Sequence, residues 1–274
     1  MGEDNAPERQ SPDAGLEPVE DVATFYDHLT ADYHLVYADW RDEAVPRQGR
    51  VLDQLIQREL GPGTRRVLDC TCGIGTQALG LALRGHQVRA SDISPAAVQR
   101  AAREAIALGV SLATSVADVR RLAASVAGAF DVVLSCDNSL PHLPTAADVR
   151  LAVAQMAAKL RPGGLLVIGI RDYDRLPAER PRATLPQVRD DLGGRSVYFQ
   201  VWDWAPDGEQ YTMHLFILRE RAGTWQTTHH STRYRALRRG ELEEALVAAG
   251  LHDIRWHEPV ETGHHQPLVT ARAV

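Results

Sequence analysis

The chain has 274 residues, 44% of them hydrophobic and 24% charged, values typical of a globular protein with one large domain or a core domain carrying an insertion. Its formal net charge of −6 argues against nucleic acid as the main partner, because a phosphate backbone is bound by a basic surface. It shows no signal-peptide pattern and no apolar run long enough to cross a bilayer, so we expect a cytoplasmic protein without a membrane partner.

The first sixty residues divide into two parts. Residues 1–20 are rich in proline, glycine and acidic residues and predict a disordered tail. Residues 21–60 look helical and end at a Gly-Pro-Gly break at 61–63. The aromatic residues of this second part are Phe25, Tyr26, Tyr33, Tyr37 and Trp40. We interpret this aromatic segment as a helical lid over a small ligand.

Short apolar strands alternate with helices over residues 61–172. The expected strands are 65–71, 87–92, 111–118, 130–137 and 165–172. The expected helices are 76–83, 95–108 and 145–160. Apolar strands separated by helices pair in parallel, with helices on both faces of the sheet. Because such crossovers are right-handed, the pattern predicts a doubly wound, Rossmann-like α/β core.

The pattern changes after Asp172. A loop rich in proline and arginine precedes three segments of alternating polarity, at 196–204, 210–218 and 224–234. We interpret residues 173–236 as an inserted antiparallel subdomain that binds the substrate. Residues 237–274 return to the core pattern and complete a seven-stranded sheet. Their expected elements are a helix at 240–249 and strands at 251–257 and 267–274.

A buried strand runs into a glycine turn that opens a helix at residues 67–77, VLDCTCGIGTQ. Gly73 and Gly75 let the backbone approach a ligand and tolerate positive φ, and the helix start supplies free N–H donors. Asp92 ends the next strand, where a carboxylate can accept both hydroxyls of a ribose. Asp118-Val119 ends the third strand, in a position to meet an adenine edge.

The same turn also fits a dinucleotide fingerprint, in which Gly73, Gly75 and Ala78 are followed by an acid such as Asp92. Asp69 favours adenosylmethionine instead. An acid just before the turn can hold the amino group of the methionine part, whereas it would repel a pyrophosphate. We therefore predict adenosylmethionine as the cofactor, with an NAD(P)-dependent oxidoreductase as the alternative.

Five segments together resemble the class I adenosylmethionine-dependent methyltransferases: VLDCTCGIGTQ, SDIS, ADV, FDVVLSCDNSLPHL and LRPGGLLVIGIRDYD. Within that class the chain is most similar to the glycine N-methyltransferase and glycine/sarcosine N-methyltransferase group. The motifs NSLPHL at 138–143 and RDYD at 171–174 carry this narrower resemblance, which extends over residues 21–274. The inserted antiparallel strands also match the small substrate domain of the group.

The resemblance implies which residues form the site. The cofactor residues are Tyr26, Asp69, Cys70, Gly73, Gly75, Gln77, Asp92, Ile93, Asp118, Val119, Asp137 and His142. The acceptor residues are Tyr33, Asn138, Arg171, Tyr173, Trp202 and His214. The catalytic residues are Tyr26 and Tyr33 near the methyl group, Asn138 at the acceptor amine, and His142 as an aid to proton removal. For the aromatic residues and His214, packing is the alternative role.

Two positions depart from the group. The arginine that follows the group's N-terminal helix has no secure counterpart, and Arg41 and Arg47 both remain open. Residues 263–267 read GHHQP where aromatic residues are expected, so the acceptor need not be glycine.

Two histidine pairs, at 229–230 and 264–265, raise the question of a metal site. No carboxylate lies at ligand spacing from either pair. Cys70 and Cys72 do not have the spacing of a metal knuckle, and we interpret them as fillers of the turn. We therefore predict no metal.

We predict direct in-line transfer of a methyl group to a small molecule, preferably to the nitrogen of an amine, amino acid or aza-heterocycle. O- or C-methylation of a secondary metabolite is the alternative with the same fold and cofactor. A nucleic-acid methyltransferase is disfavoured, because the fourth strand ends in NSLP and lacks an Asn/Asp-Pro-Pro-aromatic motif. A non-catalytic sensor is disfavoured because the acceptor residues are intact. The sequence leaves the oligomeric state open, including a homo-oligomer.

Overall fold

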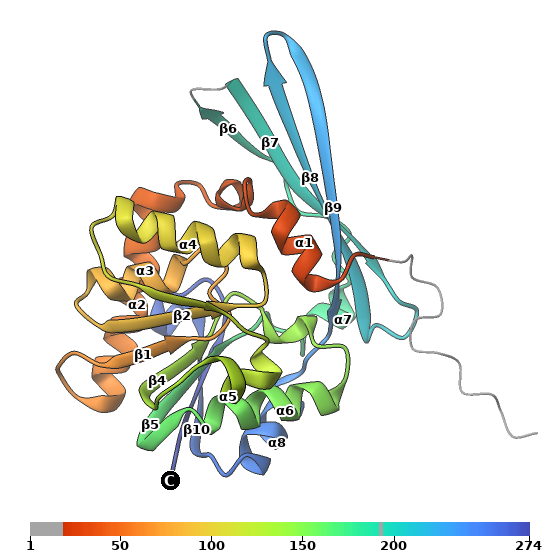
Figure 1. The fold of residues 1–274 in the computed structure, drawn as a ribbon. Coiled ribbons are helices and arrows are strands. Elements are labelled where there is room, and N and C mark those ends of the chain that lie inside the picture. The colour runs from red at the N-terminus through yellow and green to blue at the C-terminus, as the bar shows by residue number, and fades with distance from the viewer. Residues whose placement is uncertain (1–18, 192–193) are drawn as a thin grey trace, which may run out of the picture.

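Seven strands form the main sheet, in the order β10-β11-β5-β4-β1-β2-β3 (Figure 1). The computed structural model describes residues 19–191 and 194–274, so most of the predicted tail, residues 1–18, lies outside the described residues. The strands are β1 (Arg66–Asp69), β2 (Gln87–Asp92), β3 (Ala113–Val116), β4 (Phe130–Ser135), β5 (Leu160–Gly169), β10 (His252–His257) and β11 (Leu268–Arg272). Neighbours pair in parallel except at β11, which is antiparallel to β5 and to β10. The predicted doubly wound seven-stranded sheet is confirmed.

Helices cover both faces of this sheet (Figure 1). Strand residues alternate between the faces, so that Val67 and Val132 pack in one hydrophobic cluster and Leu68 and Val133 in another. The first face carries α2 (Val45–Leu60), α3 (Thr76–Leu83) and α4 (Pro95–Ala107), and the second carries α5 (Leu122–Ser125), α6 (Ala146–Ala157) and α8 (Arg239–Ala248). None of the described helices is long and apolar enough to cross a membrane.

Helices α2 and α3 approach each other closely because each has a glycine at the crossing point. A Cβ atom added to Gly49 would lie 2.3 Å from the carbonyl carbon of Gly80, and one added to Gly80 would lie 2.5 Å from the carbonyl oxygen of Val45. Both distances are far shorter than a van der Waals contact. The contact between α2 and α3 therefore requires glycine at both positions.

A second, antiparallel sheet in the order β6-β7-β8-β9 stands apart from the main sheet (Figure 1). Its strands are β6 (Gln187–Asp191), β7 (Gly194–Trp204), β8 (Gln210–Arg221) and β9 (Thr224–Arg235). The three expected segments form β7, β8 and β9, while no strand was predicted at β6. Gln187–Asp191 lacks a hydrophobic alternation, but it pairs with the open edge of β7 through its backbone. Short helix α7 (Leu176–Glu179) lies in the preceding loop.

The N-terminal lid is helical at both ends and irregular between them. Helix α1 (Val22–Leu29) begins where Asp21 accepts hydrogen bonds from the backbone N–H groups of Ala23 and Thr24, at 3.0 and 3.1 Å. A 3₁₀ turn, η1 (Tyr33–Val36), and a π-helical turn, η2 (Trp40–Ala44), then lead into α2. Trp40 fixes this irregular stretch to α3, because its indole N–H donates to the Thr76 hydroxyl at 2.8 Å.

The lid lies between the two sheets. Helix α1 contacts β9, and the Tyr198 hydroxyl of β7 donates to the Val36 carbonyl at 2.9 Å.

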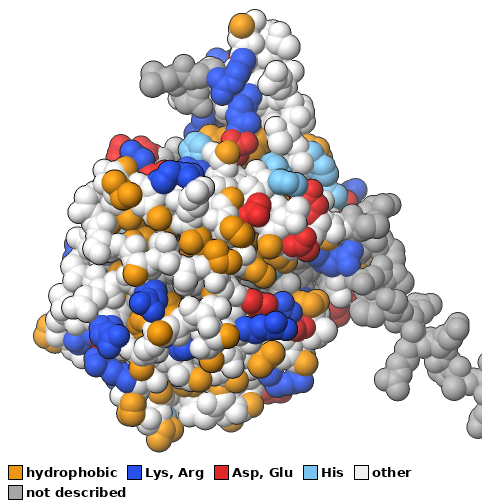
Figure 2. Space-filling view, viewed as in Figure 1, with side chains coloured by type: hydrophobic (Ala, Val, Ile, Leu, Met, Phe, Trp, Pro, Cys, Tyr) orange, Lys and Arg blue, Asp and Glu red, His pale blue; other side chains and the backbone are white. Residues whose placement is uncertain are grey.

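On the face shown in Figure 2, lysine and arginine side chains occur in small groups separated by acidic and apolar ones.

Candidate active site

The glycine turn lies at the carboxyl end of β1, the edge where parallel α/β sheets bind ligands. Gly73 and Gly75 have φ values of +51° and +97°, which other residues rarely adopt. Asp92 at the end of β2 shapes the turn, because one carboxylate oxygen accepts from the Gly73 N–H at 2.8 Å and the other from the Ser94 N–H at 3.0 Å. Both oxygens keep a second lone pair that a ribose hydroxyl can use.

Asp69 is fully buried at the end of β1. Its Oδ1 atom lies 3.4 Å from the Thr71 N–H, and its Oδ2 atom has no hydrogen-bond partner among the described residues. Burial raises the pKa of Asp69 well above its ordinary value, and Asp92 and Asp137 add to this effect. A buried carboxylate oxygen without a donor is unfavourable, so this position suits a ligand that brings an ammonium group.

A cavity of about 410 Å³ lies over this turn, a volume suited to a small ligand. The expected cofactor residues that line it are Tyr26, Cys70, Gly73, Asp92, Ile93, Asp118, Val119 and His142. Gly75 and Asp69 are not among its lining residues. Gln77 is buried and donates to Gln48 at 2.6 Å, and Asp137 lines a neighbouring cavity. The structure therefore gathers most of the expected cofactor residues around one cavity.

The three cysteines are buried free thiols. Burial raises the pKa of Cys70 and of Cys72 well above the ordinary value of a thiol. Both are protonated at neutral pH, which agrees with a packing role in the turn.

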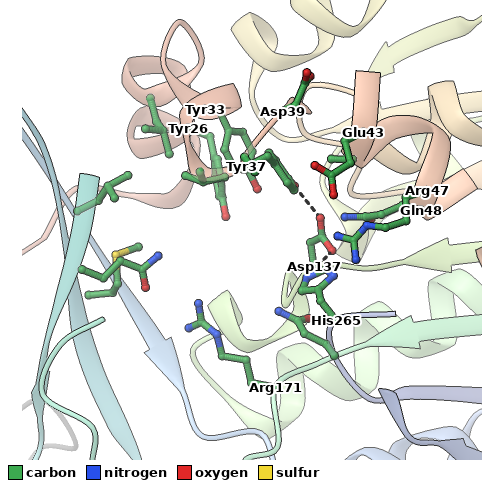
Figure 3. Close-up of a pocket in the computed structure, with 18 of the residues that line it drawn as sticks. Tyr26, Tyr33, Tyr37, Asp39, Glu43, Arg47, Gln48, Asp137, Arg171 and His265 are labelled. Atoms are coloured by element: carbon green, nitrogen blue, oxygen red, sulfur yellow. Dashed lines mark hydrogen bonds and ion pairs between the residues drawn. The ribbon is translucent and has the colours of Figure 1, made fainter. Parts of the chain in front are cut away.

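A second cavity, of about 370 Å³, adjoins the first, and Tyr26 and Tyr33 line both (Figure 3). We call it the acceptor cavity. Its walls come from the lid, from the loops after β4 and β5, from the turn before β11 and from the second sheet. Its lining residues used below are Tyr37, Asp39, Glu43, Arg47, Asp137, Arg171, Met213, Leu215, Tyr234, His265 and Gln266.

His142 lies between the lid and β9. Its Nδ1 atom is 3.2 Å from the Arg233 carbonyl oxygen, which can only accept, so Nδ1 carries the proton. Its Nε2 atom then accepts from the Tyr26 hydroxyl at 2.9 Å. Burial lowers the pKa of His142 from 6.5 to about 3, so the ring is neutral at pH 7. The expected unperturbed histidine base does not fit this position, because the Nε2 lone pair already holds the Tyr26 hydroxyl.

Asn138 follows β4 with a left-handed backbone, at φ +66°. Its side-chain oxygen accepts from the Arg171 N–H at 3.0 Å, and its amide donates to the Tyr173 hydroxyl at 2.9 Å. The Tyr173 hydroxyl lies 3.0 Å from that of Tyr211. Asn138 thus connects β4 to the start of the loop after β5, and both of its polar atoms are used within the protein.

Arg171 presents a cation to the acceptor cavity (Figure 3). Its guanidinium donates to the Tyr211 hydroxyl at 2.6 Å and lies 4.7 Å from the ring centre of Trp202 and 5.3 Å from that of Tyr234. No carboxylate of the described residues forms an ion pair with it. A part-buried cation held by aromatic faces and a neutral hydroxyl is suited to an anionic ligand.

Four expected acceptor residues do not line either cavity: Asn138, Tyr173, Trp202 and His214. Trp202 stacks on Tyr211, with ring centres 4.9 Å apart, and supports Arg171 from behind. His214 points to the other face of β8, where it contacts Asp203 and His229 at 3.0 Å each. That face is opposite to Met213 and Leu215, which line the acceptor cavity.

Sequence reasoning missed several residues of the acceptor cavity. Tyr234 lines the cavity, and Tyr211 accepts a hydrogen bond from Arg171. Both come from the second sheet and could have been found as inward positions of alternating strands. Arg47 lines the cavity, whereas Arg41 forms an ion pair with Glu104 outside it. Of the two arginines that the sequence left open, Arg47 is therefore the one placed at the acceptor cavity. His265 and Gln266 also line this cavity, and they lie in the segment 263–267 that the sequence singled out as a departure from the group.

The fold and the site define a class of protein. Residues 67–164 match a family profile described as a methyltransferase domain. A solved amino pentose methyltransferase from Micromonospora echinaspora, with bound adenosylmethionine, superposes with a TM-score of 0.69 at 22% identity, over 89% of this chain and 95% of that one. A glycopeptide N-methyltransferase complexed with sinefungin gives a TM-score of 0.56 at 18% identity, over 86% and 91% of the two chains. Residues 67–164 are therefore a methyltransferase domain, and adenosylmethionine is the cofactor of this family, as predicted.

Sequence comparison with curated proteins indicates which methyltransferases the chain resembles. Glycine/sarcosine N-methyltransferase of Parasynechococcus marenigrum is 34% identical over 160 residues, which are 58% of this chain and 52% of that protein. The enzyme of the same name from Aphanothece halophytica is 28% identical over 224 residues, 78% of this chain and 83% of that one. A ubiquinone biosynthesis O-methyltransferase of Xanthomonas axonopodis is 35% identical over 125 residues, 46% of this chain and 50% of that one. The chain spans about half the length of the first and third of these relatives. The predicted resemblance to the glycine and sarcosine group is confirmed.

Proposed function

We propose that the protein transfers a methyl group from adenosylmethionine to the nitrogen of a small acceptor that also carries an acidic group. The observation that carries this proposal is Arg171, a cation in the acceptor cavity whose partners among the described residues are a hydroxyl and two aromatic rings. It lies on the same cavity as Tyr26 and Tyr33, which also face the cofactor cavity. An acceptor whose anionic end is held by Arg171 would therefore direct its other end towards the cofactor.

The residues around the glycine turn fit the cofactor. The Oδ2 atom of Asp69 suits the ammonium group of the methionine part, since it is buried without a donor. Asp92 has free lone pairs for the ribose hydroxyls, and Asp118-Val119 lies on the wall where the adenine would rest. When bound, adenosylmethionine supplies a methyl group already activated by its sulfonium, so the protein needs no covalent intermediate.

The tyrosines at the junction of the two cavities have a defined task. Because the Tyr26 hydroxyl donates its proton to His142, its oxygen lone pairs are left to face the positively charged methyl group. Tyr33 packs beside Tyr26, with ring centres 5.7 Å apart, and helps to exclude water. The protein must also hold the acceptor nitrogen in line with the methyl group, at roughly 3 Å. This positioning can supply a large share of the rate enhancement.

We also propose that residues 21–60 act as the lid and residues 173–236 as the acceptor-binding part. Both contribute to the acceptor cavity, through Tyr33 and Tyr37 from the first and Met213 and Leu215 from the second. Since several relatives are glycine/sarcosine N-methyltransferases, amino acids are the first acceptors to test.

The test combines binding and a matched acceptor panel. Calorimetry should show micromolar binding of adenosylmethionine and adenosylhomocysteine and none of NADH. Mass spectrometry should then detect methylation of amines with a carboxylate, such as glycine and sarcosine, in preference to matched amines without one. Binding of NADH alone, or equal turnover of charged and neutral amines, would contradict the proposal.

Arg171 gives the sharpest variant. In Arg171→Ala the KM for the acidic acceptor should rise by about ten-fold or more, because a charge-assisted hydrogen bond is lost, while the KM for adenosylmethionine stays near wild type. Arg171→Lys should lose less, since it keeps the charge. An equal rise of both KM values would instead indicate a collapsed site.

O-methylation of a secondary metabolite is the second candidate, favoured by the identity to ubiquinone biosynthesis O-methyltransferases. It would use the same cavities. A panel of acidic phenols, assayed beside the amino acids, distinguishes the two candidates by which methylated product accumulates.

A further inference from the structure

We propose that Asp137, His264 and His265 bind a divalent transition-metal ion, with zinc as the first choice, on the wall of the acceptor cavity. The side chains offer one carboxylate oxygen and two imidazole nitrogens, and these three atoms all lie within 4.8 Å of one another. Two histidines and one carboxylate form a donor set that catalytic zinc and non-haem iron sites use, with coordination positions left open for a ligand. Figure 3 shows Asp137 and His265 together on the cavity wall.

The spacing of the donor atoms suits one ion. Asp137 Oδ1 lies 3.3 Å from His265 Nε2 and 3.9 Å from His264 Nε2. Two ligand atoms that are each about 2.0–2.1 Å from a tetrahedral zinc ion lie about 3.3–3.4 Å apart. The first pair already has this separation, and the second needs a movement of about half an ångström, well within the freedom of side-chain torsions.

The donor atoms at this wall lack other partners. His264 Nε2 and Asp137 Oδ1 are both buried without a hydrogen bond among the described residues. Asp137 Oδ1 lies 3.3 Å from His265 Nε2. A buried lone pair without a donor is unfavourable, and a bound cation would satisfy both atoms at once.

Neighbouring groups hold the proposed ligands in place. His264 Nδ1 lies 3.1 Å from the Gln266 carbonyl oxygen and 3.3 Å from the Gln266 backbone N–H. The two contacts need opposite tautomers, because the carbonyl oxygen accepts from a protonated Nδ1 whereas the Gln266 N–H donates to an unprotonated one. A metal ion bound to Nε2 would select the first, shorter contact, since it needs the Nε2 lone pair. Asp137 Oδ2 accepts from the Tyr37 hydroxyl at 2.9 Å. Such outer contacts are those that orient metal-binding histidines and carboxylates.

The charge of the cavity lining also favours a cation. Three carboxylates line the cavity, from Asp39, Glu43 and Asp137, against two cations, from Arg47 and Arg171. Arg47 forms no ion pair with Asp137 among the described residues, so the carboxylate is not already neutralised by it. His265 is 37% exposed and faces the cavity, which leaves an open side through which a ligand can reach the ion.

The fold brings these residues together, although they are distant in the chain. His264 and His265 lie in the turn between α9 (Pro259–Thr262) and β11, and β11 pairs with β5, which pairs with β4. Asp137 follows β4 with a left-handed φ of +55°, which turns it towards that neighbouring loop. The carboxylate that the sequence lacked at ligand spacing is therefore supplied by tertiary structure.

The ion would orient the acceptor. This role of the ion rests on the proposed function, in which the acceptor occupies this cavity. A coordinated amine has no lone pair left for attack, so the ion would hold an oxygen of the acceptor and leave its nitrogen free. Together with Arg171 on the same cavity, it would select acceptors with two oxygen-bearing groups.

Metal binding can be measured independently of turnover. The full chain, freed of metal by chelator dialysis, is titrated with zinc chloride by calorimetry and with cobalt(II) by visible absorption. We expect one equivalent to bind with micromolar affinity, and a cobalt spectrum of the intensity typical of four- or five-coordinate sites. Absence of binding would overturn the proposal, while adenosylmethionine binding in the same preparation would leave the proposed function standing.

Matched variants locate the ion. Asp137→Asn, which tolerates the left-handed backbone, and His265→Gln should each weaken zinc binding by about ten-fold or more. His229→Gln is the control, since it alters the separate pair of His229 and His214 on the outer face of the second sheet, and it should bind zinc as wild type does. Unchanged affinity in the first two variants, or loss in the third, would place the ion elsewhere and contradict the assignment.

A competition experiment separates the acceptor cavity from the cofactor cavity. The affinity for adenosylmethionine should be the same with and without saturating zinc. If zinc displaced adenosylmethionine, the three side chains would belong to the cofactor's site, and the proposed acceptor-side ion would be wrong.

Discussion

Asp92 illustrates how one side chain can serve both the fold and a ligand. Its two oxygens fix the Gly73 and Ser94 amides, and through them the start of α4 and the glycine turn. The same carboxylate lines the cofactor cavity. Replacing it removes a ligand contact and loosens the backbone that other contacts depend on.

In Asp92→Ala we expect the affinity for adenosylmethionine to fall by about ten-fold or more, which corresponds to about 1.4 kcal/mol. Calorimetric titration measures the change directly. Asp92→Asn keeps an oxygen acceptor and should fall between wild type and the alanine variant. An unchanged dissociation constant in Asp92→Ala would remove this residue from the site.

His142 links the site to pH. Burial lowers its pKa in the folded protein to about 3, below the ordinary 6.5. The unfolded chain therefore takes up this proton first as the pH falls, and the stability contribution is present above about pH 6.5 and lost progressively down to about pH 3. In His142→Gln this part of the acid dependence should disappear.

The corresponding measurement is urea unfolding of wild type and His142→Gln at about pH 7 and about pH 5. The wild type should lose more free energy of unfolding between the two values than the variant does. Comparison of the two proteins cancels other groups, such as Asp69, whose raised pKa acts in the opposite direction. Equal losses would show that His142 is accessible to protons in the folded state.

At the level of elements, the packing of α2 on α3 depends on two glycines that touch. The backbone atoms of Gly49 and Gly80 leave no room for a methyl group on either helix. This contact holds α3, whose N-terminus carries the glycine turn, against the lid segment that precedes β1.

Gly80→Ala should destabilise the protein by about 1–3 kcal/mol, because the added methyl group forces the helices apart. Gly240→Ala is a matched control, since it lies in α8 with open space around it and alanine is the better helix former. Thermal or urea unfolding should show a loss in the first variant and no loss in the second. A Gly80→Ala protein as stable as wild type would mean that the helix pair can shift without cost.

For the whole molecule, the cofactor cavity lies between parts that could otherwise move. Its walls include Val22 and Tyr26 of α1, Asp92 of the main sheet and Arg233 of the second sheet. A ligand that contacts all three parts stabilises the arrangement in which they are docked.

Adenosylmethionine should therefore slow hydrogen–deuterium exchange in α1 and in the carboxyl-terminal half of β9. Helix α8 is the internal control, because it packs on α6 and β10, contributes no residue to the cofactor cavity and should change little. Protection confined to the glycine turn, with none in α1, would contradict the role of the lid.

The main sheet was predictable because each of its strands has a local signal. Continuous apolar runs such as 65–71 and 130–137, separated by helices with glycine or proline ends, have one common packing solution. The glycine turn was predictable for the same reason. Gly73 and Gly75 have positive φ values, a backbone conformation that favours glycine, so the residue type itself indicates the turn. Strand β6 was missed because its pairing depends on the free edge of β7 and on no pattern of its own.

The sequence by itself determined the fold class, the cofactor class and the residues of the glycine turn, because these depend on short-range patterns of side-chain polarity and backbone conformation. Only the tertiary structure decided how side chains distant in the chain combine. It set His142 against Tyr26, placed Arg171 among aromatic residues and turned His214 away from the cavity. It also brought Asp137 to the histidines before β11. Such contacts depend on strand order and register, which bring together residues that no local spacing relates.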